Sequence, residues 1–186
     1  MLIIWDYFGV IAQDAFWYTA VRIAEGKGSS ELMDDLHHKV DLGQITWDEY
    51  CQAVSSDIGV PYKEVVDRYQ QHNIKQNTIM AIKHLPEHQH VLLSNASHMY
   101  LLPIMERLGL NSLFERVFVS SEIGFAKPDE RAYTFVLKQM SVVPGDAIMI
   151  DDSSRNIDSA KSMGIEGILF DPSLNILKEI KSLIAQ

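Results

Sequence analysis

The chain has 186 residues, of which 47% are apolar and 22% are charged, as in an ordinary globular protein. This length fits one domain, or one domain with a modest insertion. The net charge of −9 argues against nonspecific binding to nucleic acids or acidic membranes. The single cysteine, Cys51, excludes an internal disulfide, suits a reducing compartment, and is expected to be a small buried apolar residue.

No stretch of the sequence reaches the length of a membrane span. The apolar run at the N-terminus is interrupted by Asp6 and has no basic flank before it, so we expect no signal peptide. We therefore predict a cytoplasmic protein with neither nucleic-acid nor membrane partners, and a monomer is compatible with the sequence.

The first strand is predicted at the start of the chain, where a short apolar run ends at Asp6 and Gly9 follows three residues later. An apolar run of this length without helical spacing is typical of a buried strand in a parallel sheet. Ligands of open α/β sheets bind just outside the carboxyl ends of the strands. We therefore expect Asp6 to be the reactive centre, with other strand ends converging on it.

Residues from about 13 to 77 contain helical patterns and no convincing buried strand. Apolar residues recur at helical spacing from 16 to 24 and again from 32 to 40, and the segment 26–30 is expected to end the first helix and cap the second. Thr46 with Glu49 predicts a capping box for a third helix, and Pro61 is placed at the first position of a fourth. We expect four helices that pack on one another.

From Thr78 onward, strands and helices alternate. Strands are predicted at 91–94, 117–120, 147–152 and 167–170, with helices at about 101–108, 129–140 and 153–163 and at the C-terminus. This alternation predicts an α/β protein with a doubly wound parallel sheet. Residues 1–12 and 78–186 would form the core domain, and residues 13–77 a helical insertion after the first strand.

Polar residues gather at the carboxyl ends of the predicted strands and in one following loop: Asp6, Ser94, Asn95, Asp151, Asp152 and Lys127. Carboxylates from neighbouring strands repel each other unless a cation joins them, and oxygen ligands in incomplete number suit Mg²⁺. Aspartate is a known covalent nucleophile in phosphoryl transfer. The set predicts attack on phosphorus, with the metal and Lys127 stabilising the developing charge.

Each of these residues also has a simpler interpretation. Asp151, Asp152 or Ser153 would each be an ordinary cap for the next helix, and Lys127 beside Pro128 would be an ordinary solvated loop charge. It is their joint occurrence, in this order along the chain, that favours a site.

Two other groups of residues are assigned to structure. The histidines at 84, 88 and 90 are predicted to lie in a solvated loop, because Pro86 breaks the helix that would align them. Trp17, Tyr18 and Trp47 are either core residues or line the insertion's side of the site, and aromatic residues at helical spacing are more often core.

The sequence resembles the haloacid dehalogenase (HAD) superfamily of hydrolases, with four motifs in register along the whole chain. Motif one is the strand that ends in Asp6, and motif two is the segment 91–95, which ends in Ser94 and Asn95. Motif three is Lys127 within 124–129, and motif four is the segment 150–157. The helical insertion lies where members of this family carry a small helical cap.

The resemblance implies magnesium-dependent hydrolysis of a small phosphorylated metabolite through an aspartyl-phosphate intermediate. Asp6 would be the nucleophile, Ser94 would bind the phosphoryl oxygens with the Asn95 backbone nearby, and Lys127 would balance the charge between the phosphate and Asp6.

The resemblance also implies a set of metal ligands: the Asp6 carboxylate, the Phe8 backbone carbonyl and the Asp152 carboxylate, with Asp151 as the alternative acidic ligand. Asn156, together with Asp151, would lie behind the acidic metal ligand and adjust its orientation and basicity without binding the metal.

The chain departs from the family pattern at Phe8. Phosphatases of the family usually carry a second aspartate there, which protonates the leaving group and later activates water. Such general acid–base assistance is worth about two to four orders of magnitude in rate. A phosphatase without this aspartate would need a substrate with a good leaving group, or an acid from elsewhere in the chain. Asp14, His37, His38 and Asp48 are candidates for that acid, and the sequence does not rank them.

Two alternative functions stay open at this stage. The first is a non-catalytic relative that binds a phosphorylated ligand or a protein. The second is a metal-independent 2-haloacid dehalogenase, since those enzymes carry an aromatic residue at the position of Phe8. The pair Asp151 and Asp152 counts against the dehalogenase, and Arg22 is only a weak match for the arginine that such an enzyme needs in its cap.

Overall fold

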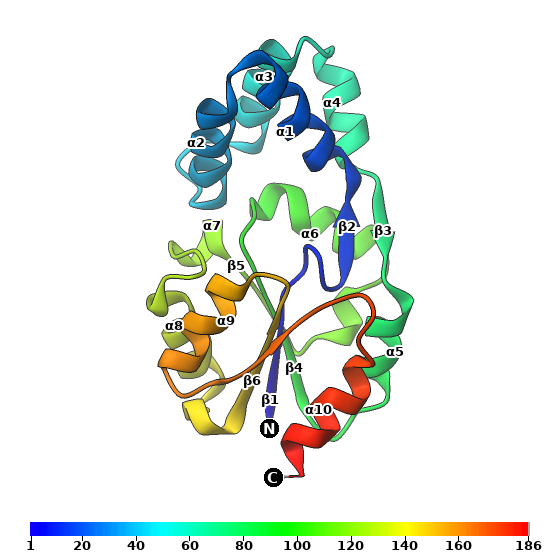
Figure 1. Cartoon of the computed structure of the whole chain (residues 1–186), viewed down its shortest axis with the longest axis vertical. Coiled ribbons are helices and arrows are strands. Elements are labelled where there is room, and N and C mark those ends of the chain that lie inside the picture. The colour runs from blue at the N-terminus through cyan, green and yellow to red at the C-terminus, as the bar shows by residue number, and fades with distance from the viewer. Residues whose placement is uncertain (186) are drawn as a thin grey trace.

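The computed structural model describes residues 1–185, and a five-stranded parallel sheet forms its centre (Figure 1). The strands stand in the order β5-β4-β1-β6-β7. Their bounds are Leu2–Trp5 (β1), Gln89–Ser94 (β4), Arg116–Val119 (β5), Ala147–Asp151 (β6) and Glu166–Leu169 (β7). The predicted α/β class and parallel sheet are confirmed, with the strand ends shifted by one or two residues.

Strand β1 occupies the middle of the sheet and is covered on both faces. Ile3 and Trp5 belong to one buried apolar cluster, whereas Leu2 and Ile4 belong to another. Because successive side chains of a strand point to opposite faces, an uninterrupted apolar run suits a strand that is buried on both sides.

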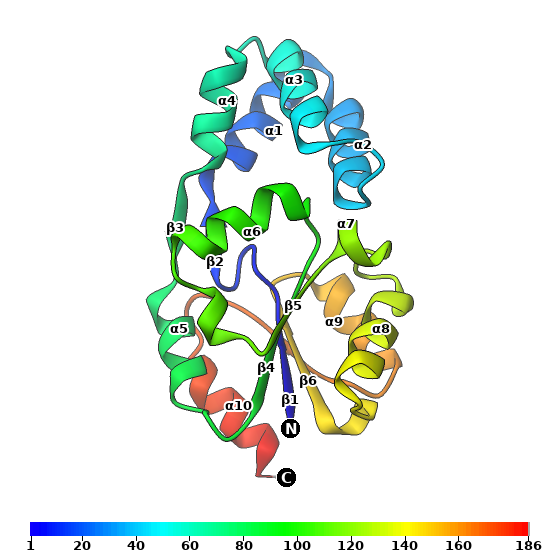
Figure 2. The same ribbon diagram turned by 180° about the vertical axis from the view of Figure 1, so that it is seen from behind.

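Helices cover both faces of the sheet, as a doubly wound fold requires. One face carries α5 (Gln76–Lys83), α6 (His98–Arg107) and α10 (Ile176–Ile184), and the other carries α8 (Glu130–Met140) and α9 (Ser154–Ser162). Figures 1 and 2 show these two layers on opposite sides of the strands. The short helix α7 (Ser120–Ile123) follows β5, and two short 3₁₀ turns lie at Asn111–Leu113 and Pro144–Asp146.

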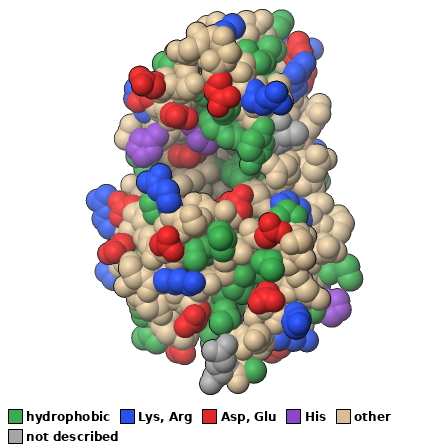
Figure 3. Space-filling model, in the orientation of Figure 1, with side chains coloured by type: hydrophobic (Ala, Val, Ile, Leu, Met, Phe, Trp, Pro, Cys, Tyr) green, Lys and Arg blue, Asp and Glu red, His purple; other side chains and the backbone are tan. Residues whose placement is uncertain are grey.

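Between β1 and β4, the chain forms a bundle of four helices beyond the carboxyl ends of the strands. These helices are α1 (Ala15–Lys27), α2 (Ser30–Asp41), α3 (Trp47–Ile58) and α4 (Tyr62–Tyr69). The space-filling view shows the molecule hollowed between this bundle and the part that contains the sheet (Figure 3). Among the helices of residues 1–185, none combines the length and the apolar character that a membrane span requires.

Two short strands, β2 (Ala12–Asp14) and β3 (His72–Ile74), connect the bundle to the core. They pair with each other in antiparallel register and do not join the central sheet. The sequence predicted no buried strand between 13 and 77, and β3 is indeed not buried; short strands of mixed polarity such as β2 and β3 leave no apolar run in the sequence. The division into residues 13–77 and a core stays a prediction.

The local signals in the bundle are only partly as predicted. The Thr46 side chain accepts from the Glu49 N–H at 3.2 Å, and Glu49 accepts from the Thr46 N–H at 2.8 Å, so the capping box is present. Gly59 ends α3 with a φ of 74°. Ser29, however, does not cap α2 with its side chain, because its hydroxyl donates to Asp57 of α3 at 2.7 Å. Pro61 stands one position before α4.

The bundle has an apolar core of its own, which contains Cys51 with no exposed surface, as expected. This core extends onto α6 through Tyr100 and Ile104, so the bundle rests on a helix of the main domain.

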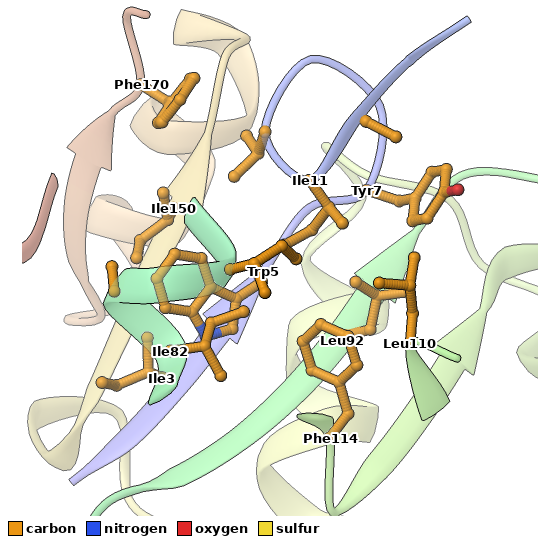
Figure 4. Packing of buried hydrophobic residues seen from close by; sticks show 14 of the residues in the cluster. Ile3, Trp5, Tyr7, Ile11, Ile82, Leu92, Leu110, Phe114, Ile150 and Phe170 are labelled. Carbon is orange, nitrogen blue, oxygen red and sulfur yellow. The ribbon is translucent and has the colours of Figure 1, made fainter. Parts of the chain in front are cut away.

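The largest apolar cluster surrounds Trp5 (Figure 4). The indole N–H of Trp5 donates to Nδ1 of His90 at 3.0 Å, and Nε2 of His90 contacts the Leu85 carbonyl at 2.8 Å. His90 is therefore a buried strand residue with both ring nitrogens in use. The prediction that it lies in a solvated loop is wrong, because β4 begins earlier than its apolar run.

Candidate active site

Three neighbouring strands end at one edge of the sheet and bring the predicted polar residues together. Asp6 directly follows β1, Ser94 ends β4 and Asp151 ends β6. The Asp6 N–H donates to the Ile150 carbonyl at 2.9 Å, which continues the pairing with β6 and holds Asp6 in place. The parallel direction of the strands is the cause of this convergence.

Lys127 links two of the carboxylates. Its Nζ lies 2.8 Å from Oδ1 of Asp6 and 2.7 Å from Oδ2 of Asp151. Lys127 is 5% exposed and Asp151 is fully buried, so the interpretation of Lys127 as a solvated loop charge is wrong. Breaking such a buried ion pair by removing one partner is costly.

Burial and charge set the protonation of this group. Burial raises the pKa of Asp6 to about 7, while the Lys127 cation opposes the rise and the Asp151 carboxylate adds to it. Burial alone would lower the pKa of Lys127, but the Asp6 and Asp151 carboxylates raise it above its ordinary value. A second cation near Asp6 would therefore favour the charged carboxylate.

The two aspartates after β6 have different surroundings. Both oxygens of Asp151 accept from the Asn156 amide at 3.0 Å, and Oδ1 also accepts from the Ser153 N–H at 2.9 Å. Asp152 is exposed and lines the cavity that Asp6 also lines. Burial and the neighbouring Asp151 carboxylate raise the pKa of Asp152. Asp151 thus serves the internal network, and Asp152 faces the cavity.

The loop after Asp6 lies directly against Asp152. Gly9 has a φ of +79°, and a Cβ at this position would lie 1.9 Å from Oδ2 of Asp152. The Lys75 ammonium donates to the Gly9 carbonyl on the same loop. The backbone of Gly9 therefore runs beside the Asp152 carboxylate.

The acidic cluster has the chemistry of a divalent-cation site. Asp6, Asp151 and Asp152 offer carboxylate oxygens within 4.8 Å of one another, and the described part of the chain has no other such group. Three carboxylates outweigh the single ammonium group of Lys127. An all-oxygen set with few protein ligands suits Mg²⁺, which keeps several waters and shares a phosphate.

Ser94 supplies a buried hydroxyl with no hydrogen-bond partner among the described residues. Leaving a buried polar group unpaired costs about 1–3 kcal/mol, so the site favours a ligand that satisfies it. Ser94 itself does not line the cavity, whereas Asn95 does.

The Asn95 side chain has a function that sequence analysis missed. It accepts from the Lys127 N–H at 2.8 Å and donates to the Lys127 carbonyl at 2.8 Å. Asn95 therefore holds the loop that presents Lys127 to Asp6.

Phe8 packs in an aromatic cluster at the edge of the cavity. Its ring meets the Tyr7 ring edge-on, with centroids 5.0 Å apart, and lies nearly parallel to the Tyr100 ring at 6.2 Å. Position 8 therefore supplies no proton donor, and a carboxylate there would enter aromatic surroundings.

The cavity between the bundle and the strand ends has a volume of about 310 Å³. On the sheet side it is lined by Asp6, Asn95, Lys127, Asp152 and Asn156. The opposite walls are mainly aromatic and come from the bundle and α6: Trp17, Tyr18, Trp47, Tyr50, Tyr69 and Tyr100. The aromatic residues predicted as core or site wall thus lie at the cavity.

Asp41, the last residue of α2, also lines the cavity. Asp41 was not identified as a site residue from the sequence. Asp41 is 7% exposed, and burial, with a further contribution from the Asp6 carboxylate, raises its pKa to about 8. In the sequence, this residue follows an amphipathic helix and belongs to no motif. No local signal distinguishes it from a surface carboxylate.

The four candidate replacement acids differ in where they lie relative to the cavity. His37 lines the cavity, with Nε2 3.7 Å from Oδ2 of Asp41, and burial lowers its pKa to about 4. His38 and Asp48 do not line the cavity. The side chain of Asp14 lies outside the described residues.

Comparison with known proteins identifies the family. The sequence profile of the family "haloacid dehalogenase-like hydrolase" matches residues 1–164. The protein therefore belongs to the haloacid dehalogenase-like hydrolases.

Two solved structures share the fold. A HAD family enzyme from Bacteroides thetaiotaomicron superposes with a TM-score of 0.79 at 18% identity, covering 96% of this chain and 97% of that one. A predicted HAD-like family hydrolase from Porphyromonas gingivalis gives 0.76 at 22% identity, covering 100% and 98%.

Among curated relatives, the ribulose-1,5-bisphosphate 5-phosphatase of Halopiger xanaduensis is 31% identical over 134 residues. The match covers 71% of this chain and 49% of that protein. The chain thus spans about half of this relative's length.

Proposed function

We propose that this protein is a magnesium-dependent phosphatase that hydrolyses a small phosphate monoester, with Asp6 as the nucleophile. The observation that carries the proposal is the placement of Asp6, Lys127 and Asp152 on one cavity, with Lys127 Nζ 2.8 Å from the Asp6 carboxylate. The Halopiger relative is a phosphatase by name, which supports the same reaction class.

The residues present fit Mg²⁺. The Asp6 and Asp152 carboxylates and the Phe8 carbonyl would hold the ion, with Asp151 held behind them by Asn156 and Lys127. Crystal structures of the Bacteroides HAD enzyme contain magnesium, in two cases together with inorganic phosphate. When bound, the ion would neutralise charge on the phosphoryl oxygens.

The chain's own residues would perform the steps in order. Lys127 would bind the phosphoryl oxygens in the cavity, and Asn95 would keep Lys127 in place. Ser94, which does not line the cavity but has an unpaired hydroxyl, stays a predicted ligand of the phosphoryl group. A carboxylate oxygen of Asp6 attacks phosphorus, the bond from phosphorus to the leaving oxygen breaks, and an aspartyl-phosphate forms. Water then attacks the same phosphorus and releases phosphate, which restores the Asp6 carboxylate.

The cavity walls favour a substrate whose organic part is uncharged. Among the described residues that line the cavity, Lys127 is the only lysine or arginine. It already faces the carboxyl groups of the site, so a second anionic group on the substrate would find no cation. The aromatic walls suit a ring-shaped or planar neutral group, which stacks on aromatic faces. The helical bundle would act as a cap that encloses this group.

Phe8 favours one alternative, a relative that binds a phosphorylated ligand or a protein without turnover. The third function, 2-haloacid dehalogenation, lacks support in the cavity: Arg22 is exposed and is not among the lining residues, and Asp151 and Asp152 are both present.

The test is a panel of phosphate monoesters with neutral and anionic organic groups, assayed with and without Mg²⁺. We expect turnover of neutral monoesters that requires Mg²⁺ and that falls roughly a thousandfold or more in Asp6→Asn. Turnover that survives in Asp6→Asn would rule out Asp6 as the nucleophile. Binding of fluoroberyllate without any turnover would select the ligand-binding relative, and chloride release from 2-haloacids without metal would select the dehalogenase.

A further inference from the structure

Asp41 is a carboxyl group of the helical bundle that faces the catalytic residues of the core. It ends α2, yet it lines the same cavity as Asp6, Lys127 and Asp152. The charges of Asp6 and Lys127 both act on its ionisation, which places it within electrostatic reach of the reaction centre. No other carboxyl group of the described bundle residues lines this cavity.

The core holds Asp41 in place through its backbone. The Ser120 hydroxyl, at the start of α7, donates to the Asp41 carbonyl at 2.6 Å in a buried hydrogen bond. Two residues further on, Gly43 lies so close to the core that a Cβ would be 2.9 Å from the Ser121 carbonyl oxygen. The end of α2 is thus held against the start of α7 by contacts of its own, apart from the strands β2 and β3.

The surroundings of Asp41 keep its proton on at neutral pH. Burial raises the pKa of Asp41 to about 8, the Asp6 carboxylate adds to this rise, and the Lys127 cation opposes it. The other titratable groups against it are His37 on its own helix and Tyr50 on α3. Burial lowers the pKa of His37 to about 4, so it carries no charge that would ionise Asp41. Burial raises the pKa of Tyr50 well above its ordinary value.

We propose that Asp41 is the general acid and base of the reaction, which moves this function from position 8 to the helical bundle. The proposal rests on the phosphatase function proposed above. As the bond from phosphorus to the leaving oxygen breaks, the Asp41 carboxyl gives its proton to that oxygen, and the product leaves as an alcohol. The Asp41 carboxylate then takes a proton from the water that attacks the aspartyl-phosphate, which restores the carboxyl group.

This assignment accounts for Phe8. Loss of the usual carboxylate would cost about two to four orders of magnitude in rate if nothing replaced it. With the acid on the bundle, position 8 is available for an aromatic ring that packs against Tyr7 and Tyr100.

The test compares leaving groups in single-turnover reactions of the full chain with Mg²⁺, using Asp41→Asn. Asparagine has nearly the same shape as the protonated carboxyl group, so the fold should be retained. For an alkyl phosphate, whose leaving oxygen needs a proton, we expect release of the alcohol to slow about a hundredfold or more. For p-nitrophenyl phosphate, whose leaving group is stable as an anion, release in the first step should change little.

Asp35→Asn is the matched control, because Asp35 lies on the same helix but is exposed and pairs only with Lys39 among the described contacts. It should leave both rates unchanged. Equal slowing of both substrates in Asp41→Asn would show a structural role and overturn the proposal, as would no slowing of either. If the wild-type protein hydrolyses neither substrate, the proposed phosphatase function fails, and the assignment of Asp41 fails with it.

Discussion

The Ser120 hydroxyl and the Asp41 carbonyl form a 2.6 Å hydrogen bond that joins the core to the helical bundle. It attaches the bundle at a further point, in addition to the paired strands β2 and β3 and the apolar contact with α6. This attachment joins the end of α2 to the start of α7, on the side of the molecule opposite β2 and β3 (Figure 1). Changes at this contact should therefore affect closure of the site more than stability of either part.

Gly43→Ala should loosen the bundle from the core. Gly43 has a φ of +67°, and the new Cβ would meet the Ser121 carbonyl oxygen at 2.9 Å. We expect faster amide hydrogen exchange in α2 and α7 and a higher KM for a phosphate monoester. Gly109→Ala is the control, because Gly109 has the same φ of +67° and nothing within 4 Å of the added Cβ. Both variants should lose about 1 kcal/mol of unfolding free energy from backbone strain, and equal exchange in the two would contradict the contact's role.

Gly9→Ala should weaken Mg²⁺ binding. A Cβ at position 9 would lie 1.9 Å from Oδ2 of Asp152, so the Asp152 carboxylate would have to move away. A titration of wild-type and variant proteins with Mg²⁺ by calorimetry measures the effect, and we expect roughly a tenfold or greater loss of affinity. Gly28→Ala, with a φ of +73° and open space around the Cβ, controls for backbone strain. Unchanged affinity in Gly9→Ala would argue against Asp152 as a ligand.

Lys127→Met should destabilise the protein strongly, since it leaves the Asp6 and Asp151 carboxylates buried without their cation. We expect a loss of about 3–5 kcal/mol in the free energy of unfolding, measured by urea denaturation without metal. Saturating Mg²⁺ should recover part of it by supplying positive charge to the same carboxylates. Lys39→Met removes an exposed ion pair and should cost less than about 1 kcal/mol. A Lys127→Met loss that Mg²⁺ does not reduce would mean that the cation binds elsewhere.

Asp41→Asn should change how stability depends on pH. The pKa of Asp41 is about 8 in the folded protein, against 3.8 for an unperturbed aspartate. Between these values, the folded state keeps a proton that the unfolded state releases, so this group makes stability fall as pH rises. Asparagine does not titrate. The variant should therefore gain stability relative to the wild type as pH rises from about 4 to 8. Above about pH 8, the difference in stability between the two proteins should change little.

Urea midpoints measured over this pH range without metal test the prediction. The charged and titratable groups that face Asp41, which are Asp6, Lys127, His37 and Tyr50, are present in both proteins. Parallel stability curves for the two proteins would mean that Asp41 is ionised in the folded state at neutral pH.

Local patterns in the sequence were enough to predict the sheet and the residues at its edge. The apolar run before Asp6 predicts β1, and the runs before Ser94 and Asp151 predict its neighbours β4 and β6. Parallel strands end on the same side, so the convergence of these side chains follows from the order of elements alone. The capping box of Thr46 and Glu49 was also predictable, because its two residues are only three positions apart in the sequence.

Only the tertiary structure decided the contacts between residues that are distant in the chain, because such contacts leave no local signal in the sequence. Asn95 and Lys127 are 32 residues apart, and the hydrogen bond from Ser120 to Asp41 spans 79. The burial of His90 depends on Trp5, 85 residues away. By itself the sequence determined the parallel sheet, the set of residues at its edge and the lack of a carboxylate at position 8. The fold decided that Asp41 lies over that edge and keeps its proton, because burial and the field of Asp6 exist only once the helical bundle has packed on the core.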